Sequence, residues 1–205
     1  MDVTIRPEEA RDYAAVENLT REAFWNVYSP GCSEHYIVHR GRGDAEFIPE
    51  LSLVLELDGR IVGHIVYFKS RIELDGGGSM PCLIFGPVSI DPAYQRRGLG
   101  KRLVDRSLEL AAGMGYDCVC IEGDIAFYGK CGFVVAGGKG IRESGQPEGE
   151  VSNHFLLREL RCGALYGKTG RFVIPDVYNV SESEVEEFDS RFPPKTKLRL
   201  PGQLA

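Results

Sequence analysis

Apolar and polar positions along the chain follow two periods, and each change of period marks an expected element. Val3 and Ile5 alternate with polar neighbours, which predicts a first strand. After Pro7 the apolar residues recur at helical spacing, so we expect an amphipathic helix that ends near Trp25. Residues 29–47, rich in Gly, His and Arg, have room for one short helix.

The pattern then becomes that of strands. Residues 51–74 predict a hairpin, because an Asp-Gly turn separates two runs of alternating apolar residues. Residues 80–90 form a long apolar run that Gly86 and Pro87 interrupt, and we expect a bulge or bend there. The hairpin and this run together predict three consecutive strands.

The second half of the chain alternates helices and strands. A helix with one apolar and one charged face begins after Gly98 and ends at Gly113 or Gly115. The remaining expected elements are a strand, a short helix and two further strands, at residues 117–123, 125–132, 133–136 and 153–160. This order of elements predicts an α/β fold.

Composition narrows the class of protein. The chain has 205 residues, 43% apolar and 26% charged, as in soluble globular proteins, which argues against disorder or a coiled coil. No apolar run approaches the roughly 18–20 residues of a membrane span, and the N-terminal segment is acidic, unlike a secretory signal. The formal net charge of −6 argues against a general nucleic-acid binder. We expect a cytoplasmic protein that binds neither membrane nor nucleic acid.

The sequence predicts one domain followed by a C-terminal extension. We expect one domain over residues 1–160, and an extension over residues 161–205 that packs on this domain. The extension has too little apolar material for a core of its own. It contains a capped acidic segment and a proline-rich stretch with basic residues.

The six cysteines are expected to be buried thiols, because no C-x-x-C pair occurs and the expected compartment is reducing. Cys118 and Cys120 would share one face of a strand. Cys32, His35 and His39 have the spacing of ligands on one helical face, but we favour a surface helix that borders an acceptor cleft, with no metal.

The segment QRRGLG carries the clearest chemistry. It joins a strand to a helix, and Gly98 and Gly100 allow a ligand to approach the backbone. Arg96, Arg97 and Lys101 add positive charge beside the first helical amides, which suits a diphosphate. An ordinary loop with solvated arginines is the alternative. The segment predicts a site for a cofactor that carries a pyrophosphate.

Two other phosphate motifs fit less well. A dinucleotide-binding G-x-G-x-x-G needs a glycine where Leu103 stands. Residues 163–169 resemble a Walker loop, but only three residues separate their glycines and no clear helix follows. Neither a Rossmann site nor a P-loop is therefore expected.

These residues carry a family resemblance. QRRGLG matches the Q/R-x-x-G-x-G/A signature of the GCN5-related N-acetyltransferase (GNAT) superfamily, and FGPVSIDP precedes it as in that family. AFYGKCGFVVA resembles the family's short helix with a tyrosine, followed by Gly-Phe at the start of the next strand. The resemblance covers Val3 to Leu160. Within the family, these segments are similar to those of a bacterial subgroup of acetyltransferases whose substrates are mostly unassigned.

The resemblance implies a mixed, mostly antiparallel sheet with splayed parallel strands in its middle, flanked by helices. It also implies acetyl-CoA as co-substrate, lying between the strands that contain Val88 and Glu122, and no metal. The backbones of Val88 and Ile90 would pair with the pantetheine. The residues implied to wrap the pyrophosphate are Gln95, Arg96, Arg97, Gly98, Leu99, Gly100 and Lys101.

The resemblance indicates one catalytic group, and the position of a glutamate after an apolar strand suggests the other. Tyr128 matches the family's tyrosine and is our candidate acid for the departing thiolate. An amine with a pKa near 10.4 is only about 0.04% neutral at pH 7, so a base or a water-mediated proton route is needed. We favour Glu122, with Asp124 as the alternative, although Asp124 suits a helix cap. A bulge at Gly86 would present a backbone N–H to the thioester carbonyl.

The resulting hypothesis is an N-acetyltransferase that moves the acetyl group of acetyl-CoA to a primary amine of a small molecule or peptide, by direct attack on the thioester. The acidic balance mildly favours cationic acceptors. A non-catalytic sensor of acyl-CoA on the same fold is the alternative. The sequence leaves open whether the chain forms a homodimer.

Overall fold

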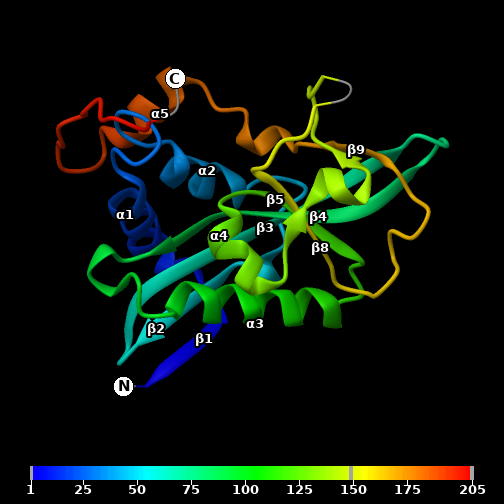
Figure 1. The fold of residues 1–205 in the computed structure, drawn as a ribbon. Helices are drawn as coiled ribbons and strands as arrows, with labels where there is room; N and C mark the ends of the chain where they lie inside the picture. The colour runs from blue at the N-terminus through cyan, green and yellow to red at the C-terminus, as the bar shows by residue number, and fades with distance from the viewer. Residues whose placement is uncertain (1, 148–149, 204–205) are drawn as a thin grey trace. The chain divides into compact units, whose positions relative to one another are not determined.

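Figure 1 shows the computed structural model, which describes residues 2–147 and 150–203. Its contacts divide the chain into two compact units, and two long strands pass from one unit into the other. The first unit contains Met1–Val66, Pro87–Leu103 and Asp176–Ala205. The second unit contains Tyr67–Gly86 and Val104–Pro175.

The sheet of the first unit begins with three antiparallel strands. They are β1 (Val3–Pro7), β2 (Leu53–Leu57) and the first part of β3 (Arg60–Leu74). Asp58 and Gly59 between β2 and β3 have φ angles of 49° and 80°. Two successive positive φ angles are those of the turn that Asp-Gly favours, so the predicted hairpin is confirmed.

Three helices belong to the first unit: α1 (Tyr13–Phe24), α2 (Glu34–Gly41) and α5 (Glu182–Asp189). Helix α1 stops at Trp25 as predicted, and α2 is the one short helix expected in its region. Ser181 caps α5 in a capping box with Glu184. Figure 1 shows α1 and α2 side by side, with α5 against α2.

The second unit contains most of the remaining strands. Strand β4 (Ser79–Ile90) contributes residues up to Gly86, and β5 (Cys118–Glu122) lies parallel to it. Strand β8 (Phe155–Glu159) runs antiparallel to β5 and to β6 (Val134–Val135). With both antiparallel and parallel pairs and flanking helices, the predicted fold class is confirmed.

Two strands of this unit, β7 (Ile141–Arg142) and β9 (Gly170–Val173), were not expected. Strand β9 pairs antiparallel with β3 and parallel with β7. Its four residues are too few to give a periodic signal, and the long-range pairing makes them a strand. Residues 161–175 thus take part in the sheet of the second unit, whereas residues 176–203 belong to the first unit.

The two remaining helices follow the sequence pattern. Helix α3 (Leu99–Gly113) buries Leu103, Val104, Leu108 and Ala111, the face predicted from their spacing. Helix α4 (Ile125–Tyr128) continues into one further turn, which Gly132 ends with a φ of 82°. Glycine tolerates this left-handed conformation, which explains why it closes the turn.

Strand β4 is distorted where the sequence suggested a bend. Gly86 has a φ of 150°, which residues with a side chain rarely adopt, although the strand continues to Ile90. The cysteines are all free, and five of them are buried as expected. Cys162 is exposed, contrary to the prediction, because it lies in the turn region after β8. Within the described chain, no helix is long and apolar enough to span a membrane.

Candidate active site

An open strand edge marks the centre of the second unit. Among the described residues, β4 and β5 form two parallel pairs and then stop pairing, while Ile121 and Glu122 continue β5 and pair with β8 on their other side. The parallel pairs are Leu83 with Val119 and Ile84 with Cys120. The edge of β5 that faces β4 is therefore free to receive an extended ligand beside Glu122.

Gly123 leaves room for the ring of Tyr128 directly after the end of β5. The structure places Glu122 at the end of β5, and the ring of Tyr128 lies against Gly123, the next residue. A Cβ atom at Gly123 would stand 2.4 Å from Cε2 of this ring, which is closer than any real contact. Only glycine at this position lets Tyr128 occupy its place near Glu122.

Asp124, the alternative base, has a structural role. Its carboxylate accepts a hydrogen bond of 2.8 Å from the backbone amide of Ala126 and caps α4. This bond uses one carboxylate oxygen to hold the helix that carries Tyr128. The geometry therefore favours the capping role for Asp124 and leaves Glu122 as the base candidate.

Tyr128 belongs to an aromatic cluster. Its ring centroid lies 5.8 Å from that of Phe85 and 5.7 Å from that of Phe133. Tyr67, buried next to Phe85, shares a hydrogen bond of 2.8 Å with the hydroxyl of Ser107. Burial raises the pKa of Tyr67, so this phenol stays protonated. The cluster holds Tyr128 on an apolar support.

The structure adds a carboxyl group that sequence reasoning missed. Glu143 lies in the loop after β7, and its charged neighbour is the carboxyl group of Glu122. Burial first, and then the interaction with Glu122, raise the pKa of Glu143 to about 7. No sequence motif connects the two residues, because the loop after β7 and the end of β5 meet only in the fold.

The QRRGLG loop lies in the first unit and begins with an ordered turn. Asp91 accepts a hydrogen bond of 2.9 Å from the amide of Ala93, and the side chain of Gln95 donates one of 3.0 Å to the carbonyl of Ile90. Arg96 has a φ of 61°, an uncommon conformation for a residue with a side chain. The backbone of this loop is thus held in a strained, specific conformation.

The second half of the loop fits an anion. Gly98 has a φ of 79°, and no atom lies within 4 Å of the position that its Cβ would take. The first hydrogen bond of α3 runs from the amide of Arg102 to the carbonyl of Gly98, so the amides of Leu99 and Gly100 precede the helical ladder. The side chains of Arg96 and Arg97 are exposed beside them. This geometry suits a pyrophosphate.

The Cys32, His35 and His39 positions differ from the prediction. His35 is fully buried rather than at a surface: its Nδ1 lies 3.4 Å from the Cys32 sulfur and its Nε2 lies 3.1 Å from Asp189. Burial lowers the pKa of His35 to about 4 and raises that of Cys32 to about 12. His39 pairs with Glu17 at 2.9 Å. Across the described residues, no group of three or more His, Cys, Asp or Glu side chains is arranged to hold a metal.

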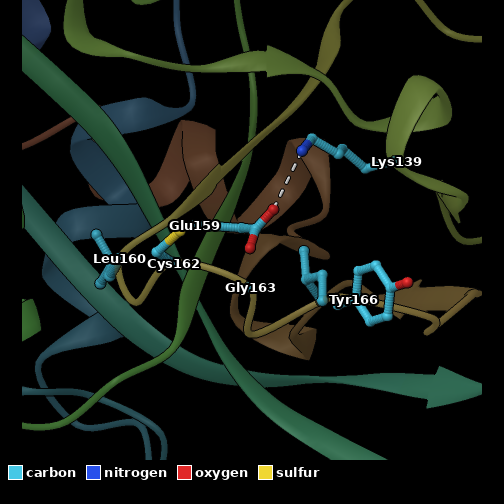
Figure 2. A pocket seen from close by; sticks show the side chains of 7 residues that line it. Lys139, Glu159, Leu160, Cys162, Gly163 and Tyr166 are labelled. Atoms are coloured by element: carbon cyan, nitrogen blue, oxygen red, sulfur yellow. Dashed lines mark hydrogen bonds and ion pairs between the residues drawn. The ribbon is translucent and has the colours of Figure 1, made fainter.

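Each unit also has a cavity of its own. Figure 2 shows one of about 610 Å³ in the second unit, where Lys139 and Glu159 form an ion pair of 3.2 Å. Glu159 pairs with Cys118 whereas Glu122 pairs with Phe155, so this cavity lies at the opposite end of β5 from Glu122. The cavity of the first unit, about 670 Å³, is lined by α1, the β2–β3 turn and residues 91–93.

Comparison with known proteins agrees with this geometry. Residues 14–133, more than half of the chain, match the model of the Acetyltransferase (GNAT) family. The chain belongs to the GNAT acetyltransferases. The matched segment contains both QRRGLG and the Glu122 to Tyr128 segment.

Two curated relatives from Escherichia coli (strain K12) are named as N-acetyltransferases. The chain is 26% identical to the uncharacterized N-acetyltransferase YhbS over 166 residues, which cover 81% of this chain and 92% of YhbS. It is 35% identical to the uncharacterized N-acetyltransferase YjhQ over 94 residues. That match spans 45% of this GNAT chain and about half, 51%, of YjhQ.

Two solved structures have a similar fold. The Escherichia coli YhbS structure in complex with CoA has a TM-score of 0.73 and 26% identity, covering 87% of this chain and 92% of that one. A GNAT family acetyltransferase from Brucella melitensis, in complex with acetyl-CoA, has a TM-score of 0.67 and 25% identity, covering 86% and 98%. Both similarities extend over most of each chain.

Proposed function

We propose that this GNAT enzyme transfers the acetyl group of acetyl-CoA to a primary amine of a small molecule or peptide. The observation that carries the proposal is the preformed anion loop at the start of α3, an exposed amide-rich turn beside two arginines. The two neighbours that hold CoA or acetyl-CoA support the choice of cofactor.

In the first unit, the loop binds the pyrophosphate. The amides of Leu99 and Gly100 donate to its oxygens, Arg96 and Arg97 neutralise its charge, and Gly98 leaves room for close approach. Gln95 holds the loop to β4 through the carbonyl of Ile90, and Lys101 extends the positive surface. The backbones of Val88 and Ile90 pair with the pantetheine.

In the second unit, Glu122 acts as the general base and Tyr128 as the general acid. Acetyl-CoA supplies an activated acetyl group. Glu122 removes a proton from the acceptor ammonium, so that a neutral amine attacks the thioester carbonyl. Tyr128 donates a proton or hydrogen bond to the departing sulfur, and the aromatic cluster keeps its hydroxyl in place. Nothing observed favours a non-catalytic sensor on this fold.

Three wider expectations belong to the same proposal. Residues 1–160 carry the acetyltransferase fold, and residues 161–205 extend it. The protein works in the cytoplasm, and its acceptors are cationic because the net charge is −6. Partners other than the amine acceptor are limited to a second copy of the chain.

Calorimetric titration with acetyl-CoA tests the cofactor site. We expect micromolar binding by the wild type and a loss of at least tenfold in an Arg97→Glu/Gly100→Asp variant, which places negative charge at the loop. Arg11→Glu is the matched control, because Arg11 is an exposed arginine of the same unit outside the loop. No binding by the wild type, or equal binding by both variants, contradicts the cofactor assignment.

A thiol-release assay then tests turnover. The panel contains a polyamine, a lysine peptide and a basic aminoglycoside, each with acetyl-CoA. We expect CoA release that depends on amine and falls at least tenfold in Tyr128→Phe. Tight acetyl-CoA binding without amine-dependent release, unchanged by Tyr128→Phe, would indicate the sensor instead.

A further inference from the structure

Phe85 lies where two parallel strands stop pairing. Strand β4 pairs with β5 at Leu83 and Ile84, and among the described residues the parallel pairing ends there. The next residue of β4 is Phe85, and the same register would place it beside Ile121 of β5. Both residues belong to the second unit and are buried. Phe85 therefore stands at the inner end of the free edge of β5.

The ring of Phe85 is at the centre of the aromatic cluster. Its centroid lies 5.0 Å from the ring of Tyr67, and 5.8 Å from the rings of both Tyr128 and Phe133. The planes are tilted or edge-on, as in closely packed aromatic pairs. Phe85 is 4% exposed and Phe133 only 2%. At such packing an added methylene group requires that a ring moves.

The rings around Phe85 are held in place by other contacts. The hydroxyl of Tyr67 shares a hydrogen bond of 2.8 Å with Ser107 of α3. The amide of Phe133 donates a hydrogen bond of 3.2 Å to the carbonyl of Tyr128. The ring of Tyr128 in turn lies against the backbone of Gly123. The cluster therefore forms a rigid wall rather than an adaptable surface.

The acyl end of the cofactor belongs at this wall. In the proposed function the pyrophosphate binds after the end of β4, and the pantetheine pairs with Val88 and Ile90. An extended cofactor then follows β4 back toward Gly86, which places its thioester near that residue. Phe85 is the next residue of the strand, and its ring packs against Tyr128, the proposed acid for the departing sulfur. The acyl group, bonded to that sulfur, thus meets the ring of Phe85.

We propose that Phe85 determines which acyl group the enzyme accepts. The methyl group of acetyl-CoA packs against its ring, and a propionyl or butyryl chain has to displace the packed rings behind it. In an apolar pocket, one methylene group changes selectivity by about 10- to 200-fold. The site is therefore selective for acetyl among straight-chain acyl groups. This inference rests on the proposed function, which places the thioester beside Tyr128.

The first test needs no acceptor. Calorimetric titration compares the affinities of the wild type for acetyl-CoA, propionyl-CoA and butyryl-CoA. We expect a loss of at least tenfold from acetyl to propionyl and a further loss for butyryl. In Phe85→Val, and to a smaller extent in the milder Phe85→Leu, the preference for acetyl-CoA over butyryl-CoA should fall at least tenfold. Equal wild-type affinities for the three thioesters, or an unchanged preference in the variants, overturns the proposal.

The second test separates acyl selection from a structural role. With the best amine of the panel, kcat/KM is measured for acetyl-CoA and for propionyl-CoA. The wild-type ratio of the two values should exceed ten, and Phe85→Val should lower this ratio at least fivefold. A structural role alone would reduce both values together and leave their ratio unchanged. An unchanged ratio in Phe85→Val therefore overturns the role of Phe85 in acyl selection.

Phe172→Val is the matched control, since Phe172 is a phenylalanine of the same unit, 1% exposed, that packs against Phe155 at 5.4 Å. It should leave both acyl preferences unchanged. Failure of the two proposals is distinguishable. A wild type that binds acetyl-CoA selectively but transfers acetyl to no amine overturns the proposed function and upholds the wall. A wild type that transfers all three acyl groups equally upholds the proposed function and overturns the wall.

Discussion

Glu8 in the first unit and Glu143 in the second are both shielded glutamates, yet their surroundings have opposite effects. The Glu8 side chain is only 2% exposed and lies 2.8 Å from Arg42, 3.0 Å from the hydroxyl of Ser52 and 3.7 Å from His64. Burial alone raises the pKa of Glu8, but His64 and Arg42 outweigh it and lower the pKa to about 2.

Glu143 has a carboxyl group as its charged neighbour instead. Burial and the interaction with Glu122 raise its pKa, while the guanidinium of Arg171 donates to the backbone carbonyls of Glu143 and Gln146. Burial raises the pKa of both carboxyls. The charge of the neighbour then decides whether the net shift is downward, as for Glu8, or upward, as for Glu143. A carboxylate next to cations, such as Glu8, stabilises the fold in its ionised form, whereas a carboxyl next to another carboxyl, such as Glu143, is protonated more readily.

The largest expected effect comes from removing the cation of the first unit. Arg42→Met leaves Glu8 and Glu17 without their common guanidinium. We expect a loss of about 3–5 kcal/mol in the free energy of unfolding, because a buried charge becomes uncompensated. Urea denaturation measures the loss. The double variant with Glu8→Gln should recover part of it, and a loss below about 1 kcal/mol would contradict the role of Arg42.

Acid should reveal the same pairing. The pKa of Glu8 is lower in the folded protein than in the unfolded chain, so its stabilising effect is complete above the ordinary glutamate value of 4.5 and is lost as pH falls toward about 2. The shift corresponds to about 3 kcal/mol. Unfolding free energies measured between pH 6 and 3 should decline less steeply in Glu8→Gln. Parallel curves for the two proteins would refute this account.

A smaller effect is expected when the Glu143 loop loses its anchor. Arg171→Met removes two hydrogen bonds to backbone carbonyls and should cost about 1–2 kcal/mol in unfolding free energy. Because the carboxyl is then no longer held against Glu122, the pKa of Glu143 should fall toward the ordinary value. Carbon-13 titration reads this change. A pKa that stays near 7 would show that Arg171 does not set the approach.

The smallest expected effect is the pH-dependent contribution of Glu143 to the free energy of unfolding. Its pKa is higher in the folded protein, so its contribution is complete below the unfolded value of 4.5 and is lost as pH rises through about 7. Between pH 5 and 8 the wild type should therefore lose about 1 kcal/mol relative to Glu143→Gln, since solvent screens the pair. Thermal or urea unfolding at both pH values measures the difference. A constant difference would indicate that the two carboxyls do not interact.

The parts of the site that lie in continuous sequence were predictable. The QRRGLG loop has its glycines, arginines and helix start within one segment, so local chemistry alone indicates an anion site. The hairpin at Asp58 and the helix closed by Gly132 were predicted for the same reason. Each depends on backbone conformations that a few adjacent residues determine.

The rest depends on contacts between distant segments. Glu143 lies in a polar loop without any periodic pattern, and only the pairing of β7 with β9 carries that loop toward Glu122. Strand β9 itself is too short to recognise. His35 seemed to be a surface residue because its burial comes from α5, whose Phe188 packs against its ring at 5.3 Å.

Arg21 has a consequence for synthesis of the chain. Its side chain is 1% exposed, and its partner Asp189, 2.6 Å away, is made 168 residues later. A growing chain thus cannot neutralise the Arg21 charge with Asp189 until translation has passed residue 189. The first unit is therefore completed only after the second unit, whose residues all precede Asp176, has been translated.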